Sequence, residues 1–287
     1  MKIPYLPGCT LKTTAKNFES SAIAVCKELG IEFVELQRWN CCGTVYSLAT
    51  DNLIYQTAAI RNLLRVEEMK ENKLVTLCSM CYNTLKRANL LVKEDKEKLK
   101  TLNAFMDADY KASVTVLHLL ELMKEIGFEK IKVKKKLNGL RVAPYYGCLL
   151  TRPKEIGFDN IEEPVILGSL LNCLGADVID YPYKTECCGS YHTVMSKDVV
   201  ANRTFGILNS AKKFGAEAIV VSCPLCEFNL DWRQKDTEEK YHGFEKIPVF
   251  YFTQLLALAL GIDMNACRFD LHYVDPIPLL KEKNLLE

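Results

Sequence analysis

Short apolar segments alternate along this chain with longer segments in which apolar residues recur at helical spacing. KLVTLCSMC (residues 73–81) and AIVVSCPLC (residues 218–226) are apolar runs that end in cysteines, and they predict buried strands. Residues 25–36 and 172–182 each predict a helix end, a Gly stop and a strand. The pattern therefore alternates strand and helix, which is typical of parallel sheets covered by helices.

The pattern also occurs twice. PYLPGC (residues 4–9) matches PYYGC (residues 144–148), and TVLHLLELMKEIG (residues 115–127) matches YFTQLLALALG (residues 251–261). Each half then contains four strands, each followed by a helix. We predict an α/β fold of two pseudo-symmetric repeated domains, each a small, mostly parallel sheet flanked by helices.

The predicted domains are residues 1–135 and residues 136–287, the second with a C-terminal tail. Residues 130–139 (KIKVKKKLNG) are the expected joint, and we interpret their lysines as a solvated linker. Residues 93–111 predict an exposed helix or hairpin insertion with no chemistry of its own.

Ten of the thirteen cysteines repeat in register. In each half a single cysteine is followed by an adjacent pair and then by CxxC, and the gaps are 31 and 35 residues in the first half and 38 and 34 in the second. The first set is Cys9, Cys41, Cys42, Cys78 and Cys81, and the second is Cys148, Cys187, Cys188, Cys223 and Cys226. All fall at or after strand ends, the edge where open α/β sheets bind ligands.

The composition of the chain excludes some classes of function. Lys and Arg total 37 against 36 for Asp and Glu, so no basic field predicts nucleic-acid binding. The N-terminal residues lack the apolar core of a signal peptide, and residues 249–262 are too short for a membrane span. We therefore expect a cytoplasmic protein, where so many thiols would serve metals or redox chemistry rather than disulfides.

Five thiols in each half exceed what simple sites need. Four thiolates satisfy a zinc ion or an ordinary cubane cluster, whereas a larger or fused cluster could use all five. Adjacent cysteines cannot easily converge on one small ion, but they can reach two irons of one cluster. Zinc in one or both sites remains the alternative.

This cysteine pattern resembles the CCG, or cysteine-rich, domain, and in length and two-domain layout the chain resembles the B subunit of heterodisulfide reductase. The resemblance implies two non-cubane 4Fe-4S clusters, one held by each set of five cysteines given above. It also implies that a disulfide substrate is split between clusters that face each other at the C-terminal edges of the strands.

The chain has no flavin or nicotinamide fingerprint of its own, so its electrons must come from other proteins. The resemblance indicates which proteins these are. Expected partners are a ferredoxin similar to the C subunit of heterodisulfide reductase, an electron-bifurcating flavoprotein similar to its A subunit, and a hydrogenase or another electron-input module. The tail, residues 275–287, is expected to help dock them. The alternative function is electron transfer, as in the iron-sulfur subunits of lactate, glycolate or succinate oxidoreductases.

Cleaving a disulfide to two thiols also requires protons. Where relatives often have a histidine after the first cysteine of the second motif, this chain has Leu149, so His192 in CCGSYH is the candidate proton donor. Arg152 and Lys184 are candidates for offsetting thiolate charge or binding substrate carboxylates. His118 is expected to be a satisfied core residue.

The remaining histidines, His242 and His272, carry no functional signal. Cys26 and Cys173 lie in apolar helical runs and are expected to pack in the core. Cys267 lies in the tail without a nearby partner.

Overall fold

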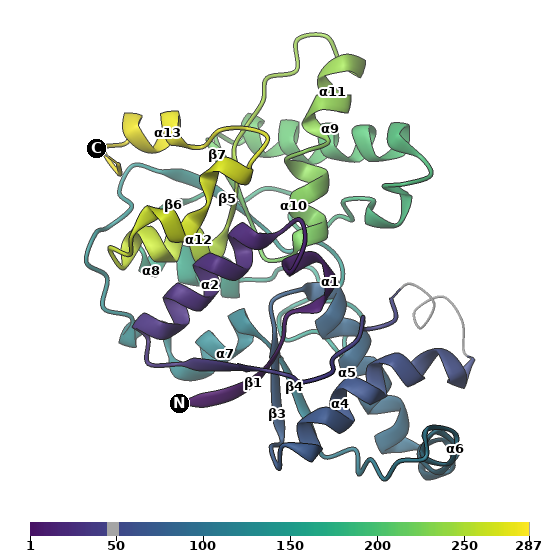
Figure 1. Ribbon diagram of the computed structural model, residues 1–287. Helices are drawn as coiled ribbons and strands as arrows, with labels where there is room; N and C mark the ends of the chain where they lie inside the picture. Colours follow the sequence, from purple (N-terminus) through teal and green to yellow (C-terminus); the bar gives the residue numbers. More distant parts are fainter. Residues whose placement is uncertain (45–51, 287) are drawn as a thin grey trace.

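The computed structural model describes residues 1–44 and 52–286, which form two halves with the same succession of strands and helices (Figure 1). The first sheet has the order β2-β1-β3-β4 and the second the order β6-β5-β7-β8, and all pairings are parallel. The strands are β1 (Lys2–Leu6), β2 (Glu32–Glu35), β3 (Lys73–Thr76) and β4 (Thr115–His118) in the first half, and β5 (Arg141–Tyr145), β6 (Asp177–Val178), β7 (Ala218–Val221) and β8 (Val249–Tyr251) in the second. The predicted α/β class with two similar halves is confirmed.

Helices connect and cover these strands. The first half contains α1 (Gly8–Leu11), α2 (Lys16–Glu28), α4 (Thr57–Glu68), α5 (Ser79–Glu94), α6 (Lys96–Met106) and α7 (Leu119–Ile126). The second contains α8 (Ile166–Cys173), α9 (Lys197–Lys213), α10 (Pro224–Leu230), α11 (Gln234–Lys240), α12 (Phe252–Ala259) and α13 (Ile277–Glu282). Short 3-10 turns are η1 (Leu53–Gln56), η2 (Phe128–Lys130), η3 (Ser190–His192), η4 (Met264–Cys267) and η5 (Phe269–Leu271).

Burial explains why the central strands are apolar. All four residues of β7 are buried, as are the last three of β3. Side chains on both faces of such strands lie under helices, so a continuous apolar run replaces the alternation of a half-exposed strand. By contrast α6, which accounts for most of residues 93–111, buries only Leu102 and confirms the expected exposed helix.

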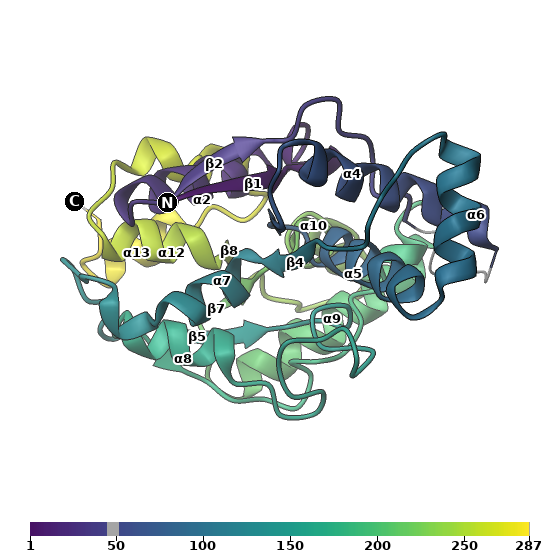
Figure 2. The same cartoon turned by 90° about the horizontal axis from the view of Figure 1, so that it is seen from below.

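The two halves pack against each other through one hydrophobic core. Figure 1 shows α2 of the first half lying beside α12 of the second, and Figure 2 shows the same two helices as neighbours from below. The Phe18 ring stacks on Tyr251 with centroids 4.2 Å apart, and the Ser21 and Thr253 hydroxyls lie 2.7 Å apart. The cysteine-bearing edges of both sheets are thereby brought together inside the molecule.

The segment expected to join the two halves, residues 130–139, packs against the second half. The backbone N–H groups of Lys134 and Lys135 donate to the carbonyl of Ala259, and Leu137 is fully buried. The Lys134 ammonium is exposed and pairs with Glu28 at 2.7 Å. Within the described part of the chain, no helix has both the length and the apolar character that crossing a membrane requires.

Candidate metal centre

The cysteines gather where strands end and helices begin. In the first half Cys9 lies in α1 directly after β1, and Cys78 is the N-cap of α5 directly after β3. In the second half Cys148 follows β5, and Cys223 is the N-cap of α10 after β7. Because the strands are parallel, these ends meet at one edge of each sheet, and helix N-termini there favour thiolates.

Within each half the five thiols form an unbroken series in which each side chain interacts with the next. The two series also touch, because the side chains of Cys78 and Cys223 interact across the boundary between the halves. The order of contacts is Cys9, Cys41, Cys42, Cys81 and Cys78 in the first half, then Cys223, Cys226, Cys188, Cys187 and Cys148 in the second. All ten thiols therefore form one continuous array.

The spacing of these thiols suits metal ligation. The Sγ atoms of Cys188 and Cys226 are 3.6 Å apart, and all the cysteines are free of disulfides. Two sulfurs bound to one tetrahedral ion at about 2.3 Å lie roughly 3.8 Å apart, so this pair is already close to the separation that a shared metal requires. The soft, all-sulfur donor set fits zinc or iron-sulfur centres.

Two glycines make room for the sulfurs. Gly8 and Gly147 each precede the first cysteine of a set and have positive φ angles of 72° and 65°. A Cβ atom at Gly8 would lie 3.0 Å from the Sγ of Cys81, and one at Gly147 would lie 3.3 Å from the Sγ of Cys226. Any larger residue would therefore press on a CxxC sulfur as well as strain the backbone.

Interactions with neighbouring thiols lower the pKa of some of these cysteines and raise the pKa of others. Hydrogen bonds from Cys42 and Cys9 lower the pKa of Cys41 to about 2. Hydrogen bonds from Cys148 and Cys188, with the positive charge of Arg203 nearby, likewise lower the pKa of Cys187 to about 2. The first member of each adjacent pair is thus held as a thiolate, the form that binds metals.

His118 joins the two cysteine-bearing edges. Its side chain is fully buried, and its Nε2 lies 2.8 Å from the carbonyl oxygen of Leu77 and 3.1 Å from that of Ser222. Each carbonyl belongs to the residue before a CxxC motif. The other nitrogen, Nδ1, accepts from the Leu120 N–H at the start of α7, so Nε2 must carry the proton and donate to both halves.

Helix α5 holds the segment around Cys148. The Asn83 side-chain amide donates to the carbonyls of Leu149 and Arg152 at 2.8 and 2.7 Å. The Tyr82 hydroxyl donates to the carbonyl of Ile156 at 2.7 Å. Polar side chains two residues or fewer from Cys81 therefore position the first cysteine segment of the other half.

Comparison with known proteins identifies the repeated unit. The sequence matches the cysteine-rich domain named CCG over residues 3–86 and again over residues 142–231. The chain belongs to the CCG cysteine-rich domain family. The two matched segments coincide with the two series of thiols, and this membership supports iron-sulfur binding.

Relatives of this CCG protein cover nearly its whole length. It is 33% identical to the 8-methylmenaquinol:fumarate reductase membrane anchor subunit of Wolinella succinogenes, over 96% of this chain and 98% of that one. It is 30% identical to the B subunit of the ferredoxin/F420H2-dependent CoB-CoM heterodisulfide reductase of Methanosarcina acetivorans, over 97% and 96%. The predicted likeness to the B subunit of heterodisulfide reductase is confirmed.

A solved structure supports the fold. A hypothetical protein from Helicobacter pylori superposes with a TM-score of 0.78 at 12% identity, over 95% of this chain. The chain spans about half of that protein (51%). At this identity the likeness concerns the fold alone.

The other residues singled out in the CCG sequence have varied surroundings. His192 lies at the end of η3, four residues beyond Cys188, and its side chain is exposed. The Lys184 ammonium pairs with Glu163 and Asp180 at 2.6 and 2.7 Å, while Arg152 donates to the Thr185 carbonyl and pairs with Glu162. Both cations are therefore engaged by neighbouring protein groups.

Two side chains that the sequence did not single out contact the second set of cysteines. Arg203 Nε, from the middle of α9, donates to the Cys187 carbonyl at 2.9 Å. Asn229 donates to the Cys188 carbonyl at 3.0 Å. No spacing signal could reveal them, since Arg203 comes from a separate helix and Asn229 lacks a counterpart of its type in the first half.

The three cysteines outside the CCG pattern lie apart from the array. Cys26 is buried in α2, as expected of a core residue. Cys173 is only partly buried, and its Sγ lies 3.3 Å from the Phe128 carbonyl. Cys267 is fully buried in η4.

A buried group behind α10 resembles a second metal site. The ligand-type atoms of Glu227, Asp231 and His272 lie within 4.8 Å of one another. However, Nε2 of His272 faces the side-chain NH2 groups of Asn17 and Gln254, whose amide oxygens accept backbone N–H groups. Nε2 must therefore accept, Nδ1 carries the proton, and His272 cannot offer Nδ1 to a metal.

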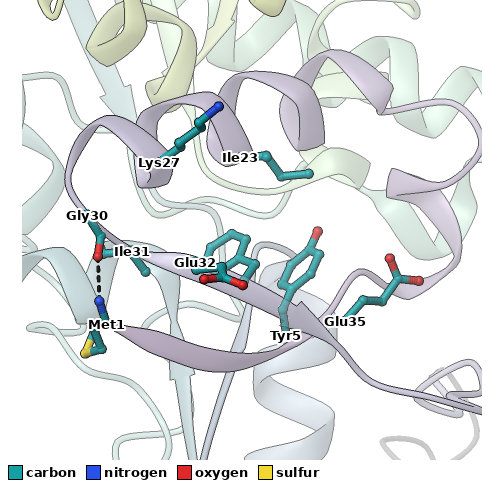
Figure 3. A pocket seen from close by; sticks show the side chains of 9 residues that line it. Met1, Tyr5, Ile23, Lys27, Gly30, Ile31, Glu32 and Glu35 are labelled. Atoms are coloured by element: carbon teal, nitrogen blue, oxygen red, sulfur yellow. Dashed lines mark hydrogen bonds between the residues drawn. The ribbon is translucent and has the colours of Figure 1, made fainter.

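Another hollow, of about 510 Å³, lies on the outer edge of the first sheet (Figure 3). Its walls come from α2, β1 and β2, and Figure 3 shows the Lys27 and Glu35 side chains on opposite sides of it. No cysteine of the described ranges lines it.

Proposed function

We propose that this chain is the catalytic subunit of a heterodisulfide-reductase-type complex, in which a disulfide is reductively cleaved between two non-cubane 4Fe-4S clusters. The observation that carries the proposal is the contact between Cys78 and Cys223, which joins two five-cysteine sets into one array. Splitting one S–S bond into two thiols consumes two electrons and two protons, and two adjacent one-electron centres could supply the electrons together. The substrate would be CoM-S-S-CoB or an analogous disulfide.

In this proposal every repeated cysteine is a ligand. One cluster would be held by Cys9, Cys41, Cys42, Cys78 and Cys81, and the other by Cys148, Cys187, Cys188, Cys223 and Cys226. Such a site needs no free thiolate in the protein, unlike ordinary thiol–disulfide exchange. The exposed imidazole of His192 would donate a proton to a leaving thiolate.

Electrons would come from partner proteins. Relatives named as the B subunit of heterodisulfide reductase support partners of that type: a ferredoxin similar to the C subunit of that enzyme, a flavoprotein similar to its A subunit, and a hydrogenase or another electron-input module. One of these relatives is named as ferredoxin- and F420H2-dependent, which fits an external low-potential donor.

The first test is anaerobic purification of the complex with its native partners, followed by assay of disulfide reduction. We expect iron and acid-labile sulfide in a ratio near one, and we expect Cys187→Ser to abolish disulfide reduction because it removes a ligand held as a thiolate. Cys173→Ser is the matched control, since Cys173 lies outside the array. Unchanged turnover in Cys187→Ser would exclude the second centre from catalysis, and zinc without iron would favour the structural-zinc alternative.

A second function is favoured by one observation, the 33% identity to a fumarate reductase membrane anchor subunit. In that case the chain would relay electrons between a quinone-linked partner and an oxidoreductase. A purified complex that oxidises a quinol with an organic acid acceptor, and reduces no disulfide, would support this function.

A further inference from the structure

A hollow of about 470 Å³ lies at the boundary between the two halves. One wall is formed by α5, through Leu90 and Leu91, and the opposite wall by Pro153 and Ile156, from the segment after Cys148. The Tyr82 bond to the Ile156 carbonyl fixes this second wall to α5. The volume is within the range of small-molecule sites, and apolar and charged side chains share the walls.

Arg87 lines the end of this hollow that is nearest the cysteines. It lies six residues beyond Cys81 on α5, or about 9 Å along the axis, whereas Glu94 at the other end lies about 20 Å from Cys81. The Tyr191 hydroxyl is close enough to Arg87 and to Cys148 to feel the charge of both. Tyr191 is thus near both the thiol array and the Arg87 guanidinium.

The Arg87 guanidinium is uncommitted. Its side chain is exposed, and across residues 1–44 and 52–286 it forms no hydrogen bond or ion pair. Its neighbour Lys86 is held instead by the Tyr82 hydroxyl at 2.6 Å and by Glu121. Arg152 and Arg203, the other arginines near the second set of cysteines, are already paired.

The outer end of the hollow has the opposite character. Glu94 contributes a carboxylate there, and the Lys98 ammonium, which also lines the hollow, is paired with Asp95 at 3.2 Å. Glu155 lines the hollow from the segment that follows Cys148. An anion would be repelled at this end and attracted at the Arg87 end. A planar guanidinium binds carboxylate, sulfonate or phosphate oxygens through paired N–H donors.

We propose that Arg87 binds an anionic group on one arm of the disulfide substrate, with the hydrocarbon part of that arm against Leu90, Leu91 and Ile156. This inference rests on the proposed function and deepens it. The substrate class is a disulfide that carries a carboxylate, sulfonate or phosphate within a few bonds of sulfur. Arg87 then sets specificity rather than the rate of S–S cleavage.

The test compares two disulfides that differ only in charge: bis(2-carboxyethyl) disulfide and its diamide. With the intact complex, we expect Arg87→Gln to raise KM for the carboxylate form by at least about tenfold, the size of a lost charge-assisted hydrogen bond. The kcat and the KM for the diamide should stay unchanged, and Arg87→Lys should restore part of the loss. Lys93→Gln, which is exposed on the same helix but outside the hollow, is the control and should alter neither substrate.

Iron content and the visible spectrum should match the wild type in every variant, which separates a binding effect from a folding effect. If Arg87→Gln changed both disulfides equally, or changed neither, the inference would be overturned while the proposed function stood. If the wild-type complex reduced neither disulfide nor any other, the proposed function and this inference would fall together.

Discussion

At the scale of single residues, His118 connects the two halves most directly. One N–H group, shared between the carbonyls of Leu77 and Ser222, holds the strand ends that lead into both CxxC motifs. Burial lowers the pKa of His118 to about 4, so the ring is neutral at physiological pH. A charged ring at this position would have to lose its hydration in the core.

This burial makes stability depend on pH. An unfolded histidine has a pKa near 6.5, so between pH 6.5 and about 4 the unfolded chain binds a proton that folded His118 does not. Its stabilising contribution is therefore complete above pH 6.5 and is lost as the pH falls toward 4. We expect the urea midpoint of the anaerobic protein to fall less between pH 7.5 and 5 in His118→Gln than in the wild type.

The control for that measurement is His242→Gln, because His242 is exposed. It should keep the wild-type pH dependence. Identical slopes for the wild type and both variants would show that His118 titrates alike in the folded and unfolded chain.

At the scale of elements, α5 does more than carry Cys78 and Cys81. Through Asn83 it satisfies two carbonyls of the segment that follows Cys148, and its outer face forms a wall of the hollow that contains Arg87. One helix of the first half thus positions a ligand segment of the second. This arrangement couples the geometry of the two thiol sets.

We expect Asn83→Ala to destabilise the protein by about 1–3 kcal/mol, because two partly buried carbonyls lose their donor. The loss should also release metal preferentially from the second half, whose first cysteine segment is no longer held. Denaturant unfolding and the iron content after mild chelation measure the two effects. Lys93→Ala, on an exposed turn of the same helix, should change neither; equal behaviour of the two variants would contradict the positioning role.

At the scale of the whole molecule, the C-terminal segment is part of the second half rather than a free tail. Leu280 and Leu285 are buried, and the Lys283 ammonium pairs with Glu217 at 2.6 Å. A truncation near Gly261 would expose the core beneath them. Loss of a partner from such a truncation would therefore not distinguish docking from unfolding.

The exposed residues of the tail offer a cleaner test of the expected docking role. Lys281 and Glu282 are exposed on α13, so a double charge reversal, Lys281→Glu with Glu282→Lys, should leave the fold intact. If the tail helps to dock partner proteins, their copurification with this variant should fall several-fold at low salt. Full retention of the partners, with wild-type thermal stability, would remove the tail from the interface.

The sequence by itself determined the repeat, the α/β class and the register of the ten cysteines. These follow from local rules: periodicity chooses strand or helix, and parallel strands place their C-terminal ends at one edge. The burial of His118 could also be predicted from its apolar neighbours, although the structure places it at the end of β4 rather than within a helix.

Only the tertiary structure decided how the two sets meet. The contact of Cys78 with Cys223, the bridge made by His118 and the hollow beside Arg87 all join residues that are far apart along the chain. Local periodicity carries no information about such pairs, because it is the packing of one half against the other that selects them. The same packing pairs Lys184 and Arg152 with nearby carboxylates and leaves Arg87 without an ion pair within the described residues. The order of charged residues along the chain does not predict this difference.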